Sequence, residues 1–520
     1  MRLDPHVFPE RLVYKPGLDT LQEAVISSHF MHGLCRDARL EAYSDEQFRA
    51  KCLTIDPDSL DGTLLPALLR ASGAFAAERA AAARQRAREN FRHYGLDDPR
   101  RAGPAEFIAE VMFDRNFRRG SRESCAREVL CEKVRERMAA GAPIAMAIPA
   151  LPFKISSPLK SRGPLPDLAE VNFILALYEV AATIELLYGR ARPELPGPLA
   201  KFTVVSDGSR FDRLVEEPDG TARAYRAELV RWIERLGLER YVELVDYRAL
   251  LRDRLPAGAQ EAKRAIRERA VRDYALVMWP LFDPGDMAAA MQAAALADPD
   301  PESSNPEGRF VSLLKSLVYT INYRALAHFA ALPGGRFRAL YRELTGHIFE
   351  PFAAISLDEP QGAEREVEGR AAVPETPQAK EVLRRAMLRE VWGAAIEYVA
   401  EIKSDRELES EPIQACLSDH FRWTIHAKPG QLAVRVPTAL GMPVQAWAGA
   451  AVFKRTRKKK LKLCALPVLA LEGAGAIPVA LRGSGDGRQP LFYIYPDVAF
   501  ADLDGFLAAV QTQLVRTRAS

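Results

Sequence analysis

Short apolar runs and longer amphipathic stretches alternate along the chain from about Pro104 onward. The apolar runs at 144–148, 202–208 and 241–247 predict strands. The amphipathic stretches at about 125–140, 168–187 and 224–236 predict helices. Strands separated by helices are typical of an α/β protein with a largely parallel sheet. We therefore expect a Rossmann-like layered sheet flanked by helices.

Two polar loops follow directly on these predicted strands. Residues 152–167 come after the first strand, and residues 206–210 end the second. Ligands of open parallel sheets bind outside the carboxyl ends of the strands. We therefore expect both loops to lie on one rim of the sheet.

The segments on either side of this core have different patterns. The Ala/Arg-rich stretch from Gly73 to Phe91 predicts a helix with few large apolar residues, so we expect much of its surface to be exposed. A turn-rich insertion at 298–307 precedes a predicted helix near 310–331, and another helix is expected at about 379–402. The tail has strand-like runs at 421–426, 432–436, 446–453 and 461–471. We expect four parts: a helical N-terminal extension (1–106), an α/β core (107–357), an acidic, Pro-containing linker (358–378) and a C-terminal α+β part that completes the site (379–520).

Composition and charge narrow the class of protein. The 520 residues carry 72 basic and 69 acidic side chains, and a formal charge of +3 gives no whole-molecule case for nucleic acid. Six scattered cysteines without a CxxC pair are typical of free thiols in a reducing compartment. The start of the sequence has no signal-peptide pattern, and no apolar run is long enough to predict a membrane span. We expect a soluble, cytoplasmic enzyme that does not bind a membrane.

The loop at 152–167 is the first candidate site. Lys154, Lys160 and Arg162 lie close together on a segment that four prolines stiffen. Asp167 and Glu170 have the spacing of a helix N-cap and its capping box. One interpretation is an ordinary capped loop with solvated lysines. The other is a rigid cationic cradle for a phosphorylated or carboxylated ligand, with a lysine available for carbonyl chemistry.

Two further groups of polar residues belong to predicted strand ends. Ser206, Asp207 and Gly208 form a small turn that can present a hydroxyl and a carboxylate to a ligand, although a plain βα turn has the same sequence. Arg422 and His426 share one face of a predicted strand. A lone strand histidine is more often structural, and the histidine spacing predicts no metal site.

Other patterns exclude several classes of function. The sequence has no Walker A loop, no GxGxxG after a strand, no HExxH and no GxSxG. The basic run at 454–462 favours a solvated hairpin, or an electrostatic guide for anionic substrates, over nucleic-acid binding, because aromatic residues do not interleave with it.

The segment 144–170 resembles the isonitrile (isocyanide) synthase family, which includes pyoverdine-associated and dityrosine biosynthesis proteins. The resemblance rests on a PFK-type segment with Lys154, then Lys160, Gly163, Asp167 and Glu170, in that order. It continues with Ser206-Asp207-Gly208 and with the strand that carries Arg422, Ile425 and His426. Ser157 stands where the family has an asparagine, and Val444-Gln445 stands where it has Trp-His.

The resemblance implies conversion of the α-amine of an amino acid to an isonitrile, with ribulose 5-phosphate as the carbon donor and tyrosine or tryptophan as candidate amino acids. It implies no metal or redox cofactor, and an iron/2-oxoglutarate oxygenase as a pathway partner. On this basis Lys154, Asp167, Glu170, Asp207 and His426 are expected to be catalytic. Lys160, Arg162, Ser206, Gly208 and Arg422 are expected to bind substrate. A related C–N bond-forming enzyme with another amine acceptor, or a non-catalytic phosphosugar or amino-acid binding protein, stays open as an alternative.

Overall fold

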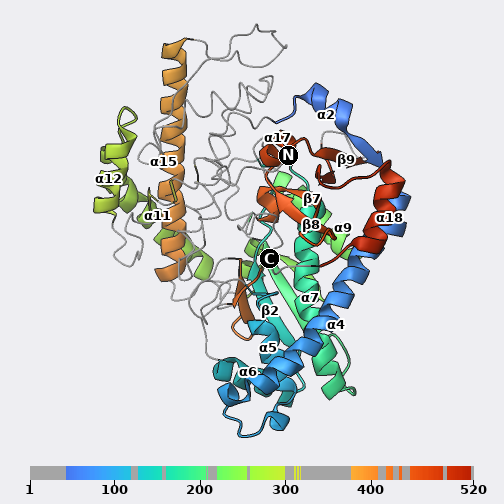
Figure 1. Ribbon diagram of the computed structural model, residues 1–520. Helices are drawn as coiled ribbons and strands as arrows, with labels where there is room; N and C mark the ends of the chain where they lie inside the picture. Colours follow the sequence, from blue (N-terminus) through green and yellow to red (C-terminus); the bar gives the residue numbers. More distant parts are fainter. Residues whose placement is uncertain are drawn as a thin grey trace.

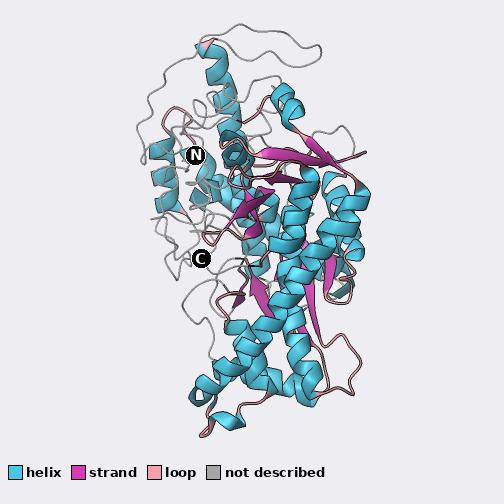
Figure 2. Ribbon diagram, turned by 45° about the vertical axis from the view of Figure 1, so that its right-hand side comes forward, coloured by secondary structure: helices cyan, strands magenta, loops and turns pink. Residues whose placement is uncertain are grey.

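A computed structural model of the chain shows two five-stranded sheets surrounded by helices (Figures 1 and 2). It describes residues 42–118, 127–154, 160–206, 208, 220–254, 258–298, 310–311, 313–314, 317, 376–407, 417–425, 432–435, 445–483 and 489–516. The predictions for the linker at 358–378, apart from its last three residues, and for most of the helix near 310–331 lie outside these ranges.

The first sheet is entirely parallel and has the order β4-β3-β2-β5-β6. Its strands are β2 (Ile144–Pro149), β3 (Ala200–Ser206), β4 (Val242–Asp246), β5 (Phe421–Thr424) and β6 (Leu432–Ala433). The chain builds outward from β2 to β3 and β4, then returns to the other side of β2 with β5 and β6. The chain is therefore an α/β protein, as the alternating pattern predicted, and its strand order reverses at β2.

Helix α7 (Leu168–Ala191) is the central helix of the protein. Eighteen of its residues are buried, and it contacts β3 of the parallel sheet as well as β7 and β8 of the second sheet. Among the described helices it is the one long and apolar enough to cross a membrane, but most of its length is buried inside the protein. Burial on all sides explains its apolar composition, because a core helix has no face to keep polar.

Helix α4 (Leu65–Glu89) contains the predicted Ala/Arg-rich helix and has one buried face. It packs along α7 and α5 (Pro104–Phe113), and its small residues Ala76, Ala80, Ala83 and Ala87 are buried. Alanine lets two helix backbones approach closely, so a stripe of alanines can form a contact face without any large side chain. Apart from these alanines and Phe75, the residues of the predicted stretch at 73–91 are exposed or half-buried, as expected.

The second sheet is mixed and combines strands from both ends of the chain. Its order is β1-β9-β10-β7-β8, with bounds β1 (Leu53–Ile55), β7 (Ala450–Arg455), β8 (Leu461–Leu466), β9 (Ile477–Leu481) and β10 (Phe492–Ile494). The run at 461–471 is a strand only as far as Leu466, because α17 (Val468–Gly473) begins after Pro467. The basic run at 454–462 forms the turn between the antiparallel strands β7 and β8, which confirms the predicted hairpin.

A group of helices lies apart from the two sheets in Figure 1 and connects β4 to β5 in sequence. Its described helices are α11 (Ala259–Met278), α12 (Met287–Ala297) and α15 (Pro377–Glu407). Helix α10 (Tyr247–Arg254), which precedes them, follows directly on β4 and packs against the parallel sheet. Lys263 of α11 joins this group to the end of β4 through a 3.2 Å hydrogen bond to Tyr247 and a 2.8 Å ion pair with Glu401 of α15.

The other described helices are shorter or lie at the surface of the sheets. They are α2 (Asp45–Lys51), α3 (Pro57–Ser59), α6 (Arg127–Ala139), α9 (Thr221–Arg235), α18 (Leu503–Gln513) and five single-turn segments (Leu60–Leu64, Phe91–Tyr94, Pro99–Arg101, Trp279–Leu281 and Ala446–Ala448). Each sheet takes strands from distant parts of the chain, because β1 pairs with β9 and β2 pairs with β5. The four-part division expected from the sequence stays a prediction.

Candidate functional site

A fully buried lysine marks the carboxyl end of β2. Lys154 has no exposed surface, and its Nζ donates 2.9 Å hydrogen bonds to Asp167 Oδ2 and Glu170 Oε2. The hydroxyl of Tyr225, on α9, donates to the other oxygen of Glu170 at 3.1 Å. These four residues, the Lys154 cluster, place one cation and two carboxyl groups among apolar neighbours.

The start of α7 fixes the two carboxyl groups. Asp167 is the N-cap and accepts a hydrogen bond from the Ala169 backbone N–H at 2.6 Å, while the Asp167 N–H donates to Glu170 Oε2 at 2.9 Å. This reciprocal capping box was predicted from the spacing of the two residues. In the folded protein the same two carboxyl groups therefore cap a helix and bind the lysine.

A sharp turn brings Lys154 back toward α7. Leu151 is buried with a φ of 57°, a left-handed conformation that a branched side chain rarely adopts. Its carbonyl accepts a 2.8 Å hydrogen bond from Ser206 Oγ at the end of β3. Gly208 lies against the Pro152 carbonyl oxygen so closely that a Cβ would overlap it. The two polar loops thus meet on one rim, as predicted.

Burial controls the ionisation of this cluster. It raises the pKa of Glu170 to about 8, with a further contribution from the charge of Asp167 against the opposing effect of Lys154. Burial also raises the pKa of Asp167. Burial alone would lower the pKa of Lys154, but the two carboxylates outweigh it and the pKa is raised. One cation facing two carboxyl groups favours retention of a proton by the pair near neutral pH.

Tyr225 is the member of the cluster that sequence reasoning missed. It is fully buried, and its pKa lies well above the usual range because of burial and the neighbouring Glu170. The pattern of α9 places Tyr225 on its apolar face, but that pattern does not distinguish a core tyrosine from one bonded to a carboxyl group.

Arg162 lies in a different set of contacts from the one expected. Its guanidinium binds both oxygens of Glu472, at 2.6 and 2.9 Å, and stacks over Phe48. The described contacts therefore hold Arg162 against the protein's own carboxylate instead of presenting it as an anion-binding group. The Lys160 carbonyl accepts a 3.1 Å hydrogen bond from the Val468 N–H.

The remaining predicted site residues fall into two sets. Ser206 and Gly208 lie at the rim beside the Lys154 cluster, and Arg422 pairs in register with Ala147 on β2. Asp207 and His426 lie outside the described residues. Within the described ranges, no group of histidine, cysteine, aspartate and glutamate residues is suited to hold a metal ion.

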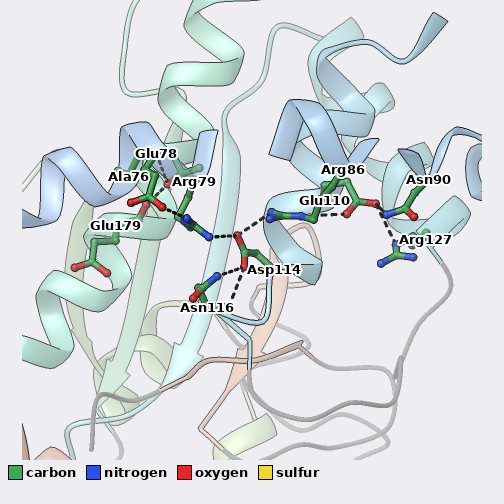
Figure 3. Close-up of polar contacts among 11 residues, drawn as sticks. Ala76, Glu78, Arg79, Arg86, Asn90, Glu110, Asp114, Asn116, Arg127 and Glu179 are labelled. Carbon is green, nitrogen blue, oxygen red and sulfur yellow. Dashed lines mark hydrogen bonds and ion pairs between the residues drawn. The ribbon is translucent and has the colours of Figure 1, made fainter. Parts of the chain in front are cut away.

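A second polar network joins α4 and α5 (Figure 3). Asp114 accepts a 2.8 Å hydrogen bond from Arg86, and Glu110 accepts hydrogen bonds from Asn90 at 3.1 Å and Tyr94 at 2.7 Å. Past Asp114, the Phe117 carbonyl accepts from the Arg435 N–H just beyond β6. The network therefore anchors the N-terminal helices to the edge of the parallel sheet.

Comparison with known proteins matches the region around the Lys154 cluster. Residues 134–289 match the family model described as "Pyoverdine/dityrosine biosynthesis protein". All four residues of the Lys154 cluster lie in this range, whereas Glu472 and Arg422 lie outside it. A buried, charged group at the carboxyl ends of parallel strands defines an α/β protein of the ligand-binding or enzyme class. Over this region the chain is similar to the isonitrile synthase family, in line with the resemblance seen in the sequence.

Individual relatives are similar over limited stretches. An L-tyrosine isonitrile synthase from Xenorhabdus nematophila is 30% identical over 115 residues, which are 22% of this chain and 32% of that protein. An L-tyrosine isonitrile synthase from Pseudomonas aeruginosa is 30% identical over 184 residues, 32% of this chain and 54% of that protein. The crystal structure of the PvcA protein from Pseudomonas aeruginosa aligns with a TM-score of 0.41 at 19% identity, covering 76% of this chain and all of that one. The chain thus spans about half or less of the length of these two curated relatives.

Proposed function

We propose that the chain is an isonitrile synthase that converts the α-amine of an amino acid to an isonitrile. The observation that carries the proposal is the buried Lys154 cluster at the carboxyl edge of the parallel sheet. It lies inside the matched region and contains three of the residues on which the sequence resemblance rests, Lys154, Asp167 and Glu170.

The strand order supports the position of the substrate. When the strands of the parallel sheet are numbered in chain order, they lie side by side in the order 3-2-1-4-5. This order supports our proposal of a Rossmann-like sheet. Such sheets bind ligands where the order reverses, here between the carboxyl ends of β2 and β5. Lys154 follows β2, and His426 follows β5 two residues after Thr424. We propose that these two segments enclose the substrate.

The donor proposed for the carbon atom is ribulose 5-phosphate. The amine condenses with the sugar ketone to form an imine and water, and the sugar then fragments. Condensation requires a proton for the departing oxygen and removal of protons from the nitrogen. Glu170, with a pKa of about 8, is suited to both transfers near neutral pH, and Lys154 and Tyr225 hold its two oxygens.

The other predicted residues complete the proposed site. Asp167 stays paired with Lys154, and Asp207 and His426 are proposed to move protons during the reaction. Lys160, Ser206, Gly208 and Arg422 are proposed to hold the phosphate and carboxylate of the substrates. Tyrosine and tryptophan are the proposed amino acids, and an iron/2-oxoglutarate oxygenase is the proposed consumer of the isonitrile.

Incubation with ribulose 5-phosphate and a panel of amino acids, followed by mass spectrometry, tests the proposal. We expect an isonitrile product from at least one amino acid, and strong loss of that product in Glu170→Gln and Asp207→Asn. Gly62→Ala is a control outside the site, because a Cβ at Gly62 meets no atom within 4 Å. Absence of product with every amino acid, together with absence of ribulose 5-phosphate binding, would contradict the synthase proposal. Full turnover in both variants would contradict the site assignment alone.

A further inference from the structure

Glu472 of α17 is a buried carboxylate at the junction of three distant segments. It is 2% exposed and accepts hydrogen bonds from the Tyr43 N–H at 2.6 Å and from the Tyr493 hydroxyl of β10 at 2.7 Å. Its other partner is the guanidinium of Arg162, which binds both carboxylate oxygens. A charge-assisted, two-point contact of this kind fixes orientation as well as position.

Arg162 belongs to the loop that leads into the Lys154 cluster. Besides Glu472, its guanidinium donates to the Tyr43 carbonyl and lies 4.5 Å from the centre of the Phe48 ring. The arginine is therefore enclosed by the N-terminal segment on one side and α17 on the other. Its position is set by residues outside the region that matches the family model.

The rest of this loop is bonded to the same part of the protein. The Val468 N–H donates to the Lys160 carbonyl at 3.1 Å, and the Leu168 N–H donates to the Leu491 carbonyl at 3.0 Å. Between them, the Gln489 side chain exchanges two hydrogen bonds with the backbone of Leu165. The described part of the loop, 160–168, is thus held along its length by α17 and the segment before β10.

The Arg162 side of the Glu472 contact is close in sequence to the Lys154 cluster. Asp167 follows Arg162 by five residues, and Pro164 and Pro166 stiffen the connection. Tyr493, which donates to Glu472, is also near Asp167: its pKa lies well above the usual range because of burial and Glu472, with a smaller contribution from the charge of Asp167. A displacement of Arg162 should therefore reach the residue that caps α7 and pairs with Lys154.

We propose that Glu472 is a positioning residue, which acts through Arg162 to hold Asp167 and Glu170 in their contact with Lys154. The inference rests on the proposed function, since it assigns a role in the reaction to a residue of the second sheet. It also makes a statement about the folded loop that is measurable without turnover. The second sheet then serves as the support of a site built on the first.

Glu472→Gln tests the inference, with Glu179→Gln as the matched control. Glu179 is also a fully buried glutamate paired with an arginine, Arg516, but it lies on α7 about two and a half turns beyond Glu170 and contacts Ser72 and Arg516. Hydrogen exchange of peptides covering 160–170 gives the structural readout, and kcat and KM for isonitrile formation give the functional one. Arg162→Lys keeps the charge but removes the two-point contact, so it should reproduce the effect of Glu472→Gln.

We expect faster exchange at 160–170 and a fall in kcat of about 10²-fold with little change in KM for Glu472→Gln, because small displacements of reacting groups are costly. Glu179→Gln should leave both readouts near the wild-type values. Unchanged exchange, or faster exchange with unchanged kcat, would overturn the positioning role. If the wild-type protein makes no isonitrile, the proposed function fails. The structural part of the inference is tested separately, because it fails if exchange at 160–170 in Glu472→Gln is as slow as in the wild type.

Discussion

At the scale of single residues, Lys154 faces two carboxyl groups, and its one positive charge can neutralise only one of them when both are ionised. One ammonium group faces two carboxyl groups that are both buried, so the cluster is neutral only when it retains one extra proton. Glu170, whose second oxygen already accepts from Tyr225, has a pKa of about 8. The cluster is therefore most stable with that proton in place.

Replacing Glu170 by glutamine should change the pH dependence of stability. The pKa of Glu170 is raised from 4.5 to about 8 on folding, so its contribution to stability is complete below about 4.5 and is lost as the pH rises to about 8. Glutamine imitates the protonated acid and does not titrate. We expect urea unfolding of Glu170→Gln to depend less on pH across this window than unfolding of the wild type.

The pair of Arg240 and Glu185, whose glutamate side chain is half-buried, offers a control for that measurement. Glu185→Gln removes a carboxylate that is not part of the Lys154 cluster, so the pH dependence between about 4.5 and 8 should stay that of the wild type. An equally steep pH dependence in Glu170→Gln and the wild type would show that Glu170 ionises normally.

Replacing Lys154 alone should lower the free energy of unfolding more than replacing Lys154, Asp167 and Glu170 together. Lys154→Met leaves two buried carboxyl groups without their cation, and breaking a buried pair in this way costs about 3 to 5 kcal/mol. Adding Asp167→Asn and Glu170→Gln to that variant removes the unmatched charges, so part of the loss should be recovered. Urea unfolding measures both variants, and a triple variant less stable than Lys154→Met would contradict this account.

The sequence indicated the residues of this cluster better than their contacts. The spacing of Asp167 and Glu170 predicted the capping box, and the prolines predicted a stiff loop. Nothing local indicated that Lys154 bends back onto that cap, or that Tyr225 and Glu472 complete the two groups of contacts, because these partners are distant in sequence. Arg162 was expected to bind a ligand for the same reason: a sequence does not show which cation has a carboxylate of its own.

At the scale of the elements, the loop after β2 can contact the loop after β3 because residue 208 is a glycine. A Cβ at Gly208 would overlap the Pro152 carbonyl oxygen, which is backbone and cannot rotate away. Gly208→Ala should therefore destabilise the protein by about 1 to 3 kcal/mol, as overpacking does in other cores. It should also reduce isonitrile formation, because the displaced segment leads directly to Lys154.

Gly62→Ala is the matched control for thermal unfolding of Gly208→Ala. Gly62 lies in the helical turn Leu60–Leu64, and a Cβ there has open space, so alanine should be neutral or slightly stabilising. Equal melting temperatures for the two variants would mean that the loops separate at no cost.

Element boundaries were predictable where a single period dominated. Strands β2, β3 and β4 lie close to their expected positions because apolar runs between helical stretches leave few alternatives. The run at 461–471 was assigned entirely to a strand, since both a buried strand and α17 are apolar and only Pro467 separates them. The buried face of α4 was missed because alanine carries little hydrophobic signal.

At the scale of the whole molecule, we expect the two sheets to unfold together. Helix α7 packs against both, and each sheet contains strands from distant parts of the chain. Native-state hydrogen exchange in rising urea should show β3 and β8 losing protection at the same concentration. Helices α11 and α15 contact mainly each other and should open earlier; separate transitions for β3 and β8 would contradict the shared core.

The pairing of β2 with β5 also determines when the protein can fold during its synthesis. Met146 pairs with Phe421, so more than half of the chain's length separates two adjacent strands. A ribosome has made most of the polypeptide before β2 can acquire its second neighbour, and until then one edge of β2 exposes unpaired backbone groups. Expression yield should therefore depend on chaperone supply and on translation speed downstream of β4.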